Sequence, residues 1–259
     1  MMLRTFKSIV LASTALLVAG SVGAQNSGQD LSNPDSAFED TLKPGNWHTV
    51  TAETEHGHLI GNPKAEARLI EFVSYTCGHC ASFAREGDPV MDLTLLMPGD
   101  MSVEIRPVIR NAVDLTISLL VSCGDPKNFK ALHNDFMLTQ STWMARIQSA
   151  PQSQQAIWLR GDKNARLNAA SALDFDDKLT AKGVSIADVR TCLSDDAEAQ
   201  RLIEKSTASS AEFSITGTPS FALDGELLDG VHQWTTLEPV LVAKLRPAPS
   251  DEAGFFDGQ

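Results

Sequence analysis

The sequence predicts an α/β fold that is interrupted by an all-helical insert, and three observations predict it. A short, mostly apolar run at residues 67–73 is followed directly by a helical pattern that opens on a Cys-x-x-C motif. Residues 111–213 then carry apolar side chains at helical spacing and show no strand pattern. Strand character returns at residues 220–223, and a final helical pattern follows. The order strand, helix, strand before the insert is the start of a βαβ unit.

The part before the insert is expected to contain three strands and one helix. The strands are predicted at 47–51, 67–73 and 103–109, and the helix at 80–97. The second strand should be buried on both faces, because its run is short, β-branched and nearly all apolar. The helix should kink near Gly87 and Pro89. Pro107 weakens the last strand, because proline cannot donate a ladder hydrogen bond.

The insert and the segment after it follow from helix and turn signals. Helices are predicted at 111–121, 129–137, 195–213 and 235–245, and further helical pieces within 159–179 and 185–193. Asp125-Pro126 is an N-cap followed by proline at the first helical position. Ser194 is expected to cap the helix that starts at Asp195, whose first turn is acidic. Asp224-Gly225 predicts a tight hairpin between strands at 220–223 and 227–228.

The N-terminus has the pattern of a cleavable secretory signal. Arg4 and Lys7 precede an apolar run that is too short to span a membrane, and small residues follow up to Ala24. The alternative is a buried N-terminal helix. We expect cleavage after Ala24 and an exported, periplasmic protein. The expected organisation is a signal peptide at 1–24, a flexible leader at 25–45, a discontinuous α/β domain at 46–110 and 214–246, the insert at 111–213, and a flexible tail at 247–259.

Composition narrows the function. The chain has 259 residues with 42% hydrophobic and 21% charged side chains, which excludes disorder of the whole chain. The formal net charge of −12, without a basic cluster, argues against nucleic-acid binding. Four cysteines are too few for a cysteine-rich scaffold, although an oxidising compartment would let them pair.

The motif Cys77-Gly78-His79-Cys80 lies where a buried strand turns into a helix. At the helix N-terminus, free N–H groups and the helix dipole should stabilise a Cys77 thiolate, which is the attacking species in disulfide exchange. Cys80 lies one turn later, should be less exposed, and would resolve the mixed disulfide. His79 lies between them and should favour the reduced thiolate, which makes the oxidised pair a stronger oxidant.

Two other interpretations of this motif stay open. One is a structural disulfide, which an exported protein could use. The other is a metal site formed by Cys77, Cys80 and a histidine, although a closed zinc site needs four ligands and no second Cys-x-x-C is present. We expect no metal and no cofactor.

A second motif, Thr218-Pro219, stands at the entry to the strand after the insert. A Thr-Pro pair in this place suggests a cis peptide bond. Its backbone groups would then face outward and could pair with an extended substrate peptide, as an edge strand does.

The run from Glu71 to Cys80, together with Thr218-Pro219 and the following Phe221-Ala222-Leu223-Asp224-Gly225, resembles the DsbA family of exported thiol–disulfide oxidoreductases. The resemblance covers residues 46–246. It implies a thioredoxin fold interrupted by a helical domain, with Cys77 attacking, Cys80 resolving, and Thr218 and Pro219 lining the substrate groove. It also implies a DsbB-like membrane protein that reoxidises the pair.

Two further residues of the run from Glu71 to Cys80 bear on the function. Glu71 resembles the buried acid of the family, which moves a proton to or from the resolving thiol, and desolvation should raise its pKa. The alternative is a structural pair with a base on a neighbouring strand, such as Arg106. Gly78 stands where many members carry proline, so the motif resembles that of protein disulfide isomerases and implies a milder oxidant.

Cys123 and Cys192 both lie in the insert. An even number of cysteines in an exported chain suggests that they pair, and the alternative is two free buried thiols. We assign them no catalytic role.

The expected function is therefore an exported enzyme that introduces disulfides into reduced or misoxidised exported proteins. An isomerase or reductase of the same fold is the nearest alternative, and a metal-binding protein or a purely structural domain are alternatives of other classes. Only about 20 residues separate Ala24 from the first predicted strand, too few for a dimerisation domain, so we expect a monomer.

Overall fold

A computed structural model describes residues 45–246, which lie within one compact unit. The predicted signal peptide, the tail and all but the last residue of the leader fall outside the described residues. Over the described range, none of the helices combines the length and the apolar character that crossing a membrane requires.

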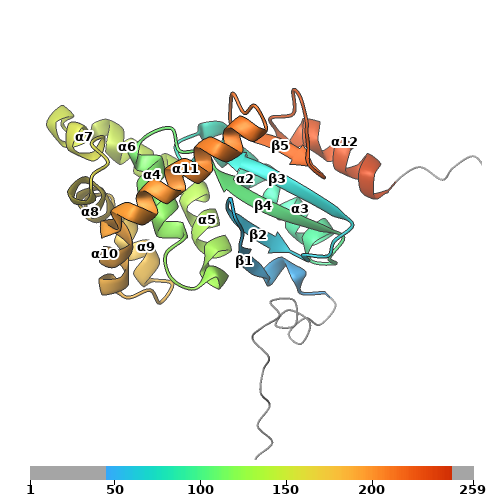
Figure 1. Ribbon diagram of the computed structural model, residues 1–259, viewed down its shortest axis with the longest axis horizontal. Helices are drawn as coiled ribbons and strands as arrows, with labels where there is room; N and C mark the ends of the chain where they lie inside the picture. Colours follow the sequence, from blue (N-terminus) through green and yellow to red (C-terminus); the bar gives the residue numbers. More distant parts are fainter. Residues whose placement is uncertain (1–44, 247–259) are drawn as a thin grey trace, which may run out of the picture. The chain divides into compact units, whose positions relative to one another are not determined.

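One mixed sheet of six strands forms the centre of the α/β part, in the order β1-β2-β4-β3-β5-β6 (Figure 1). The strands are β1 (Thr51–Glu53), β2 (His58–Gly61), β3 (Ala67–Val73), β4 (Met101–Pro107), β5 (Ser220–Leu223) and β6 (Glu226–Leu227). β3 and β4 run parallel, and all other neighbours are antiparallel. The predicted central strand is therefore present with its predicted bounds, and both its neighbours are strands predicted from the sequence.

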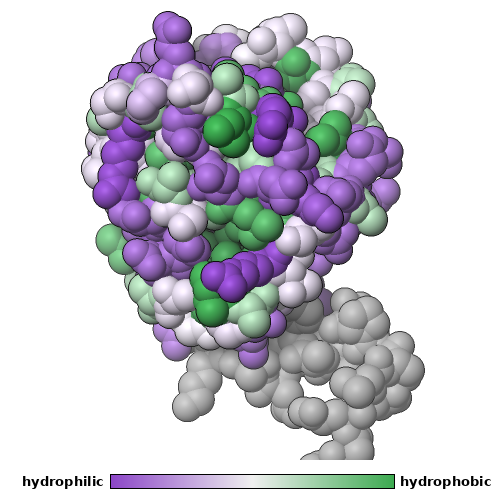
Figure 2. Space-filling view, turned by 90° about the vertical axis from the view of Figure 1, so that its left-hand side faces the viewer, coloured by the Kyte–Doolittle hydropathy of each residue, from purple (hydrophilic) through white to green (hydrophobic). Residues whose placement is uncertain are grey.

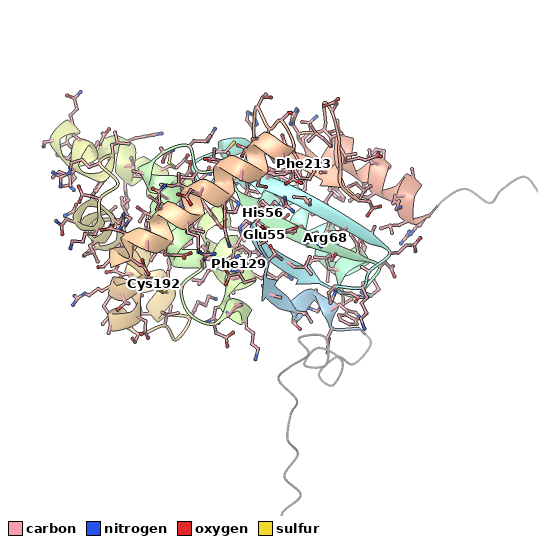
Figure 3. The ribbon with its side chains drawn as sticks, viewed as in Figure 1. Glu55, His56, Arg68, Phe129, Cys192 and Phe213 are labelled. Atoms are coloured by element: carbon pink, nitrogen blue, oxygen red, sulfur yellow. A yellow bond between two sulfur atoms is a disulfide. The ribbon has the colours of Figure 1, made fainter. Side chains whose placement is uncertain are left out.

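The register of β3 sends consecutive side chains to different layers. Glu71 pairs with Ile105 and Phe72 with Arg106, and neighbouring residues of a strand face opposite sides of the sheet. The Phe72 face packs against Phe213, at the end of the long helix that crosses the sheet in Figure 3. The Glu71 face meets the helices that follow β3. The helices around the sheet are α2 (Gly78–Glu86), α3 (Asp88–Met91), the π-helical turn η2 (Asp92–Leu96), α11 (Asp196–Glu212) and α12 (Trp234–Leu245).

The insert is entirely helical, as predicted, and residues 111–213 contain no strand. Its elements before α11 are α4 (Ala112–Val121), the short turn η3 (Pro126–Asn128), α5 (Phe129–Leu138), α6 (Gln140–Ser149), α7 (Gln152–Trp158), α8 (Lys163–Ala172), α9 (Phe175–Thr180) and α10 (Ile186–Ser194). Figure 2 shows the end of the molecule that the insert forms, where hydrophobic patches are separated by hydrophilic side chains. Trp143 and Trp158 are buried inside this bundle.

Cys123 and Cys192 form a disulfide within the insert, with their Cα atoms 5.9 Å apart. Cys123 follows α4 and Cys192 lies near the end of α10, at the end of the molecule far from the sheet (Figure 3). Of the two alternatives left by the sequence, the paired form is the one found.

Replacing Cys123 and Cys192 together by alanine should lower the free energy of unfolding by about 4 kcal/mol, because the bond closes a loop with a sequence separation of 69 residues. Urea denaturation followed by circular dichroism measures the change. Thr191→Ser, an exposed change on the same helix, serves as the control. A loss as small as that of the control would contradict a stabilising role for this bond.

Near the N-terminal edge of the sheet, one predicted strand was wrong and one strand was missed. Residues 47–51 do not form a strand: Trp47–Thr49 is a 3-10 turn, closed by hydrogen bonds from Thr49 N to Asn46 O and from Val50 N to Trp47 O, and β1 starts at Thr51. Strand β2, between β1 and β4, was not predicted. Its four residues are too few to show a period.

Several boundaries also differ from the predictions. The helix expected at 80–97 begins at Gly78 and breaks at Gly87, near the predicted kink. Asp195, not Ser194, caps α11, because its side chain accepts a hydrogen bond from Glu198 N while Ser194 still belongs to α10. Helices α6 and α7 were missed, since their mostly polar sequences carry few apolar positions. The hairpin at Asp224-Gly225 is present, with positive φ at both residues, and its second strand is Glu226–Leu227 rather than 227–228.

Candidate active site

Cys77 is the N-cap residue of α2, at the end of the loop that leaves β3. Its backbone N–H donates to Ser74 O at 3.0 Å, and its carbonyl accepts from Ala81 N at 3.2 Å. The first turn of a helix has N–H groups without partners inside the helix, so an anion beside them is stabilised. The structure therefore places Cys77 in the context that the sequence predicted.

Cys77 and Cys80 are both free thiols, and they differ in their access to solvent. Cys77 is 7% exposed and Cys80 is 1% exposed. An incoming substrate can therefore reach the Cys77 sulfur more easily than the Cys80 sulfur. This order of access matches the attacking and resolving roles expected for the two residues.

The two thiols have opposite pKa shifts. A hydrogen bond from the Cys80 thiol, assisted by the N–H groups of Cys80 and His79, lowers the pKa of Cys77 to about 4, although partial burial opposes the shift. Burial raises the pKa of Cys80 far above its ordinary value, and the Cys77 sulfur raises it further. At neutral pH the reduced site therefore holds a Cys77 thiolate beside a protonated Cys80, which is the charge distribution that disulfide exchange needs.

Thr218 lies directly against the reactive sulfur, although it follows Cys77 by more than a hundred residues, and Pro219 comes next in the chain. Their peptide bond is cis, as predicted. The Cys77 sulfur lies 3.2 Å from Thr218 O, and in its protonated form it donates a hydrogen bond to that carbonyl. A groove beside the pair is lined by His79, Phe83, Thr218, His232 and Trp234, among others. A peptide bound in this groove would lie next to the Thr218 backbone.

Glu71 is 2% exposed on the face of the sheet that meets α2 and α3. Its Oε2 has no hydrogen-bond partner among the described residues. Burial, and then the negative charge of Asp88, raise the pKa of Glu71 well above its ordinary value. A carboxyl group in this state keeps its proton to a higher pH than an exposed one and can exchange that proton with a neighbouring thiol.

The alternative pairing of Glu71 with Arg106 was wrong. Arg106 projects from the opposite face of the sheet, where it forms a salt bridge with Glu104 at 3.0 Å and donates to Ser209 at 3.0 Å. The reason is the pleat of the strands: the register places Arg106 beside Phe72, one residue after Glu71.

Two supporting residues were missed by the sequence analysis. Gln140, at the start of α6, donates through Nε2 to Tyr75 O at 2.6 Å and to Cys77 O at 2.8 Å. The buried carboxylate of Asp114 accepts from Ser74 Oγ at 2.9 Å and from Thr76 N at 2.9 Å. Both hold the loop before α2 from the insert side. A single polar residue in a helical pattern gives no signal of such a contact.

His232 and Trp234 also contribute to the site. His232 Nδ1 lies 2.8 Å from Pro219 O and so fixes the loop that carries the cis peptide bond. The Trp234 ring packs edge-on against Phe83 of α2, with ring centroids 6.4 Å apart.

Replacing Gln140 by alanine should destabilise the protein by about 2 kcal/mol, because the buried Tyr75 carbonyl would lose its donor and the Cys77 carbonyl would keep only Ala81 N. Urea denaturation measures the loss, and Gln152→Ala on the exposed start of α7 is the matched control. Equal unfolding midpoints for the two variants would show that the loop does not depend on this contact.

No group of three or more His, Cys, Asp or Glu side chains within residues 45–246 is arranged to hold a metal ion. The metal-binding interpretation of Cys77 and Cys80 therefore has no support from the described geometry.

Two cysteines, a cis-proline loop and a buried acid together form a site for exchange of thiols and disulfides.

Comparisons with known proteins show which family the chain belongs to. A family model described as thioredoxin matches residues 53–242. The chain belongs to this thioredoxin family. The crystal structure of a protein-disulfide isomerase from Novosphingobium aromaticivorans is 34% identical, covers 75% of this chain and 100% of its own, and superimposes with a TM-score of 0.70. The resemblance seen in the sequence is thus confirmed.

More distant members of the thioredoxin family support the fold. The crystal structure of Wolbachia pipientis α-DsbA1 is 18% identical, covers 72% of this chain and 89% of its own, and has a TM-score of 0.55, which shows a shared fold. A Rickettsia conorii protein named as a protein-disulfide oxidoreductase is 25% identical over 168 residues, which are 64% of this chain and 53% of the relative. The chain spans about half the length of the curated relatives it matches.

Proposed function

We propose that this protein is an exported thiol–disulfide oxidoreductase that introduces disulfides into other proteins through Cys77 and Cys80. The single observation that carries the proposal is the pair of opposite pKa shifts, with that of Cys77 lowered to about 4. A stabilised thiolate favours the reduced form of the site, and so the oxidised form readily gives up its disulfide.

The exchange proceeds in two displacements. A substrate thiolate attacks the Cys77 sulfur of the oxidised pair, the Cys77–Cys80 bond breaks, and its electron pair stays on Cys80. Because the pKa of Cys80 is strongly raised, its sulfur takes up a proton, and Glu71 is the buried acid that can supply it. A second substrate thiolate then attacks the substrate sulfur of the mixed disulfide, and Cys77 leaves as the stabilised thiolate. The substrate has lost two electrons and gained a disulfide.

The site supports a peptide substrate in an extended conformation. The Thr218 carbonyl lies 3.2 Å from the Cys77 sulfur, so a strand that pairs with the Thr218 backbone would bring its cysteine to the reactive atom. The proposed substrates are reduced or misoxidised exported proteins. Reoxidation of the reduced pair would need a membrane partner of the DsbB type. The proposed location is the periplasm, which the signal-like pattern up to Ala24 supports, and the proposed form is a monomer.

An isomerase is the second candidate, and two observations favour it. Gly78 gives the motif the form found in protein disulfide isomerases, and the Novosphingobium aromaticivorans structure, 34% identical, carries that name. The two functions differ in reduction potential and in the substrate that is processed. A weakly oxidising pair reshuffles existing disulfides, whereas a strongly oxidising pair creates new ones.

Equilibration in glutathione buffers, followed by alkylation and mass counting, tests the proposal. We expect two cysteines, Cys77 and Cys80, to change state together at a potential above about −200 mV, while Cys123 and Cys192 stay paired. Oxidation of a reduced, unfolded protein and repair of a scrambled one are then compared. Repair without net oxidation would establish the isomerase, and a potential near the roughly −270 mV of thioredoxin would establish a reductase.

A further inference from the structure

A cavity of about 250 Å³ lies outside the substrate groove, and Glu71 is among its lining residues. It lies between the sheet and helices α2, α3 and α5. Its polar lining residues come from four elements: Glu71, Asp88, Asp92, Lys130, His133 and Asn134. The volume is enough for several water molecules at roughly 30 Å³ each, and the polar side chains could hold them.

Glu71 of β3 lines this cavity with a buried side chain. This residue is 2% exposed, and its Oε2 has no partner among the described residues. The negative charge of Glu71 also raises the pKa of Cys80, which places the acid within electrostatic reach of the resolving thiol. A buried acid that exchanges protons in each catalytic cycle must recover them from solvent. Glu71 is too deeply buried to do so directly.

The outer part of the cavity supplies a second acid. Asp88 opens α3, just after the break at Gly87, and unlike Glu71 it is partly exposed. The groups that face it are Glu71 from β3, Asp92 from η2, and Lys130 and His133 from α5. Asp92 is paired with Lys130, whose Nζ also donates to His48 O at 2.7 Å. Asp92 and Lys130 therefore neutralise each other. Asp88 is the remaining acid near Glu71 that can exchange protons.

We propose that this cavity is a proton pathway in which Asp88 passes protons between solvent and Glu71, and through Glu71 to and from the Cys80 sulfur. The inference rests on the proposed exchange activity and adds a residue to it. Asp88 touches neither thiol, so it is a positioning residue that acts through Glu71.

The steps balance in both directions. When a substrate thiolate opens the Cys77–Cys80 bond, the Cys80 sulfur takes the proton of Glu71, Glu71 takes one from Asp88, and Asp88 takes one from water. When Cys80 resolves a mixed disulfide, its proton moves outward along the same groups, its sulfur bonds to the Cys77 sulfur, and the partner leaves as a thiolate. Water is the only further reactant.

The charge states of the two acids agree with this role. Burial and then Asp92 raise the pKa of Asp88 to about 7, while Lys130 lowers it. Near neutral pH, Asp88 is thus present in both protonation states, as a proton carrier must be. His133 cannot replace it, because burial, with a smaller contribution from His58, lowers the pKa of His133 to about 3, and its Nδ1 lies 3.1 Å from Tyr75 Oη.

The test isolates the step in which Cys80 resolves a mixed disulfide. Reduced protein is mixed with excess oxidised glutathione and quenched in acid, and the decay of the glutathione adduct at Cys77 is followed by mass. In the wild type, the rate should rise with pH and reach a plateau as Glu71 becomes a carboxylate. Asp88→Asn should lower this plateau about tenfold, and Asp88→Glu should restore most of it. Asp100→Asn, an exposed acid outside the cavity, is the matched control.

The pH profile separates the pathway from a simple charge effect. Removing the Asp88 charge lowers the pKa of Glu71, so the midpoint moves to lower pH with or without a proton pathway. Only a pathway also lowers the plateau. A shifted midpoint with an unchanged plateau would overturn the proposal. A wild type that never forms or resolves the adduct would instead overturn the exchange activity itself.

A second variant keeps both acids and fills the cavity. Ala84 lines the cavity from α2 and is 5% exposed, so Ala84→Leu should displace water from the pathway. We expect a lowered plateau, and no further loss when Asp88→Asn is added, because both changes interrupt the same path. If Asp88→Asn fails to fold, the Ala84→Leu variant alone tests the pathway. A plateau rate equal to that of the wild type would then overturn the proposal.

Discussion

Replacing Cys77 by serine should abolish disulfide exchange, while replacing Cys80 by serine should trap the enzyme on its substrate. Cys77 is the more accessible sulfur and has its pKa lowered to about 4, so it is the atom that a substrate thiol meets. A serine hydroxyl cannot form a disulfide, and the loss should reach the detection limit. Without Cys80, the mixed disulfide at Cys77 still forms but cannot be resolved from within the protein.

The measurement is the oxidation of a reduced substrate protein, with covalent adducts counted by mass under non-reducing conditions. Each variant is the control for the other, because both remove one thiol from the same motif. The pair Cys123→Ala with Cys192→Ala should retain the exchange rate of the wild type at a temperature where it is folded. Adducts on the Cys77→Ser protein, at Cys80, would show that the two roles are reversed.

The reduced protein should be more stable to heat than the oxidised protein at pH 7, and the difference should shrink towards pH 4. Cys77 titrates only in the reduced form. Its pKa falls from an ordinary value of 9.0 in the unfolded chain to about 4 in the folded one. A group with a lowered folded pKa adds stability that is fully present above the unfolded pKa and is lost as the pH falls through the folded pKa. The thiolate contribution should therefore be full above pH 9, decline between pH 9 and pH 4, and be absent below pH 4.

Thermal unfolding of both redox forms at several pH values measures this contribution. Each kcal/mol should raise the midpoint by about 2–4 °C in a protein of this size. Absorbance of the thiolate near 240 nm should titrate with a midpoint near pH 4 in the same samples. An oxidised form that is the more stable one at pH 7 would contradict the stabilised thiolate and, with it, the oxidising direction of the proposed function.

The sequence predicted the parts of the fold that depend on local patterns. β3 precedes the cysteine motif and α2 begins within it. Each carries its own signal, which is a short β-branched run for β3 and a helical repeat for α2. The helical insert and the hairpin at Asp224-Gly225 were visible for the same reason. β2 was not, because four residues between Gly57 and Asn62 are defined by their pairing with β1 and β4 rather than by their own pattern.

The candidate site divides in the same way. Cys77, Cys80 and the pair Thr218-Pro219 are residue types with few other uses in this context, so their positions in the chain were informative. Gln140 and Asp114 support the same loop but belong to common residue types inside helices. The alternative pairing of Glu71 with Arg106 failed because a one-residue offset between strands moves a side chain to the other face. No sequence pattern reports that register.

The contacts of Gln140 tie the helical insert to the α/β part of the fold. Its amide reaches out of the insert to the carbonyls of Tyr75 and Cys77, so the insert completes the hydrogen bonding of the catalytic loop. A miniature made by excising the insert and splicing the flanking ends would leave the Tyr75 carbonyl without a donor and the Cys77 carbonyl with Ala81 N alone. The insert therefore does not behave as a removable module, and grafting this motif onto a smaller scaffold requires replacements for the Gln140 amide and for the Asp114 carboxylate.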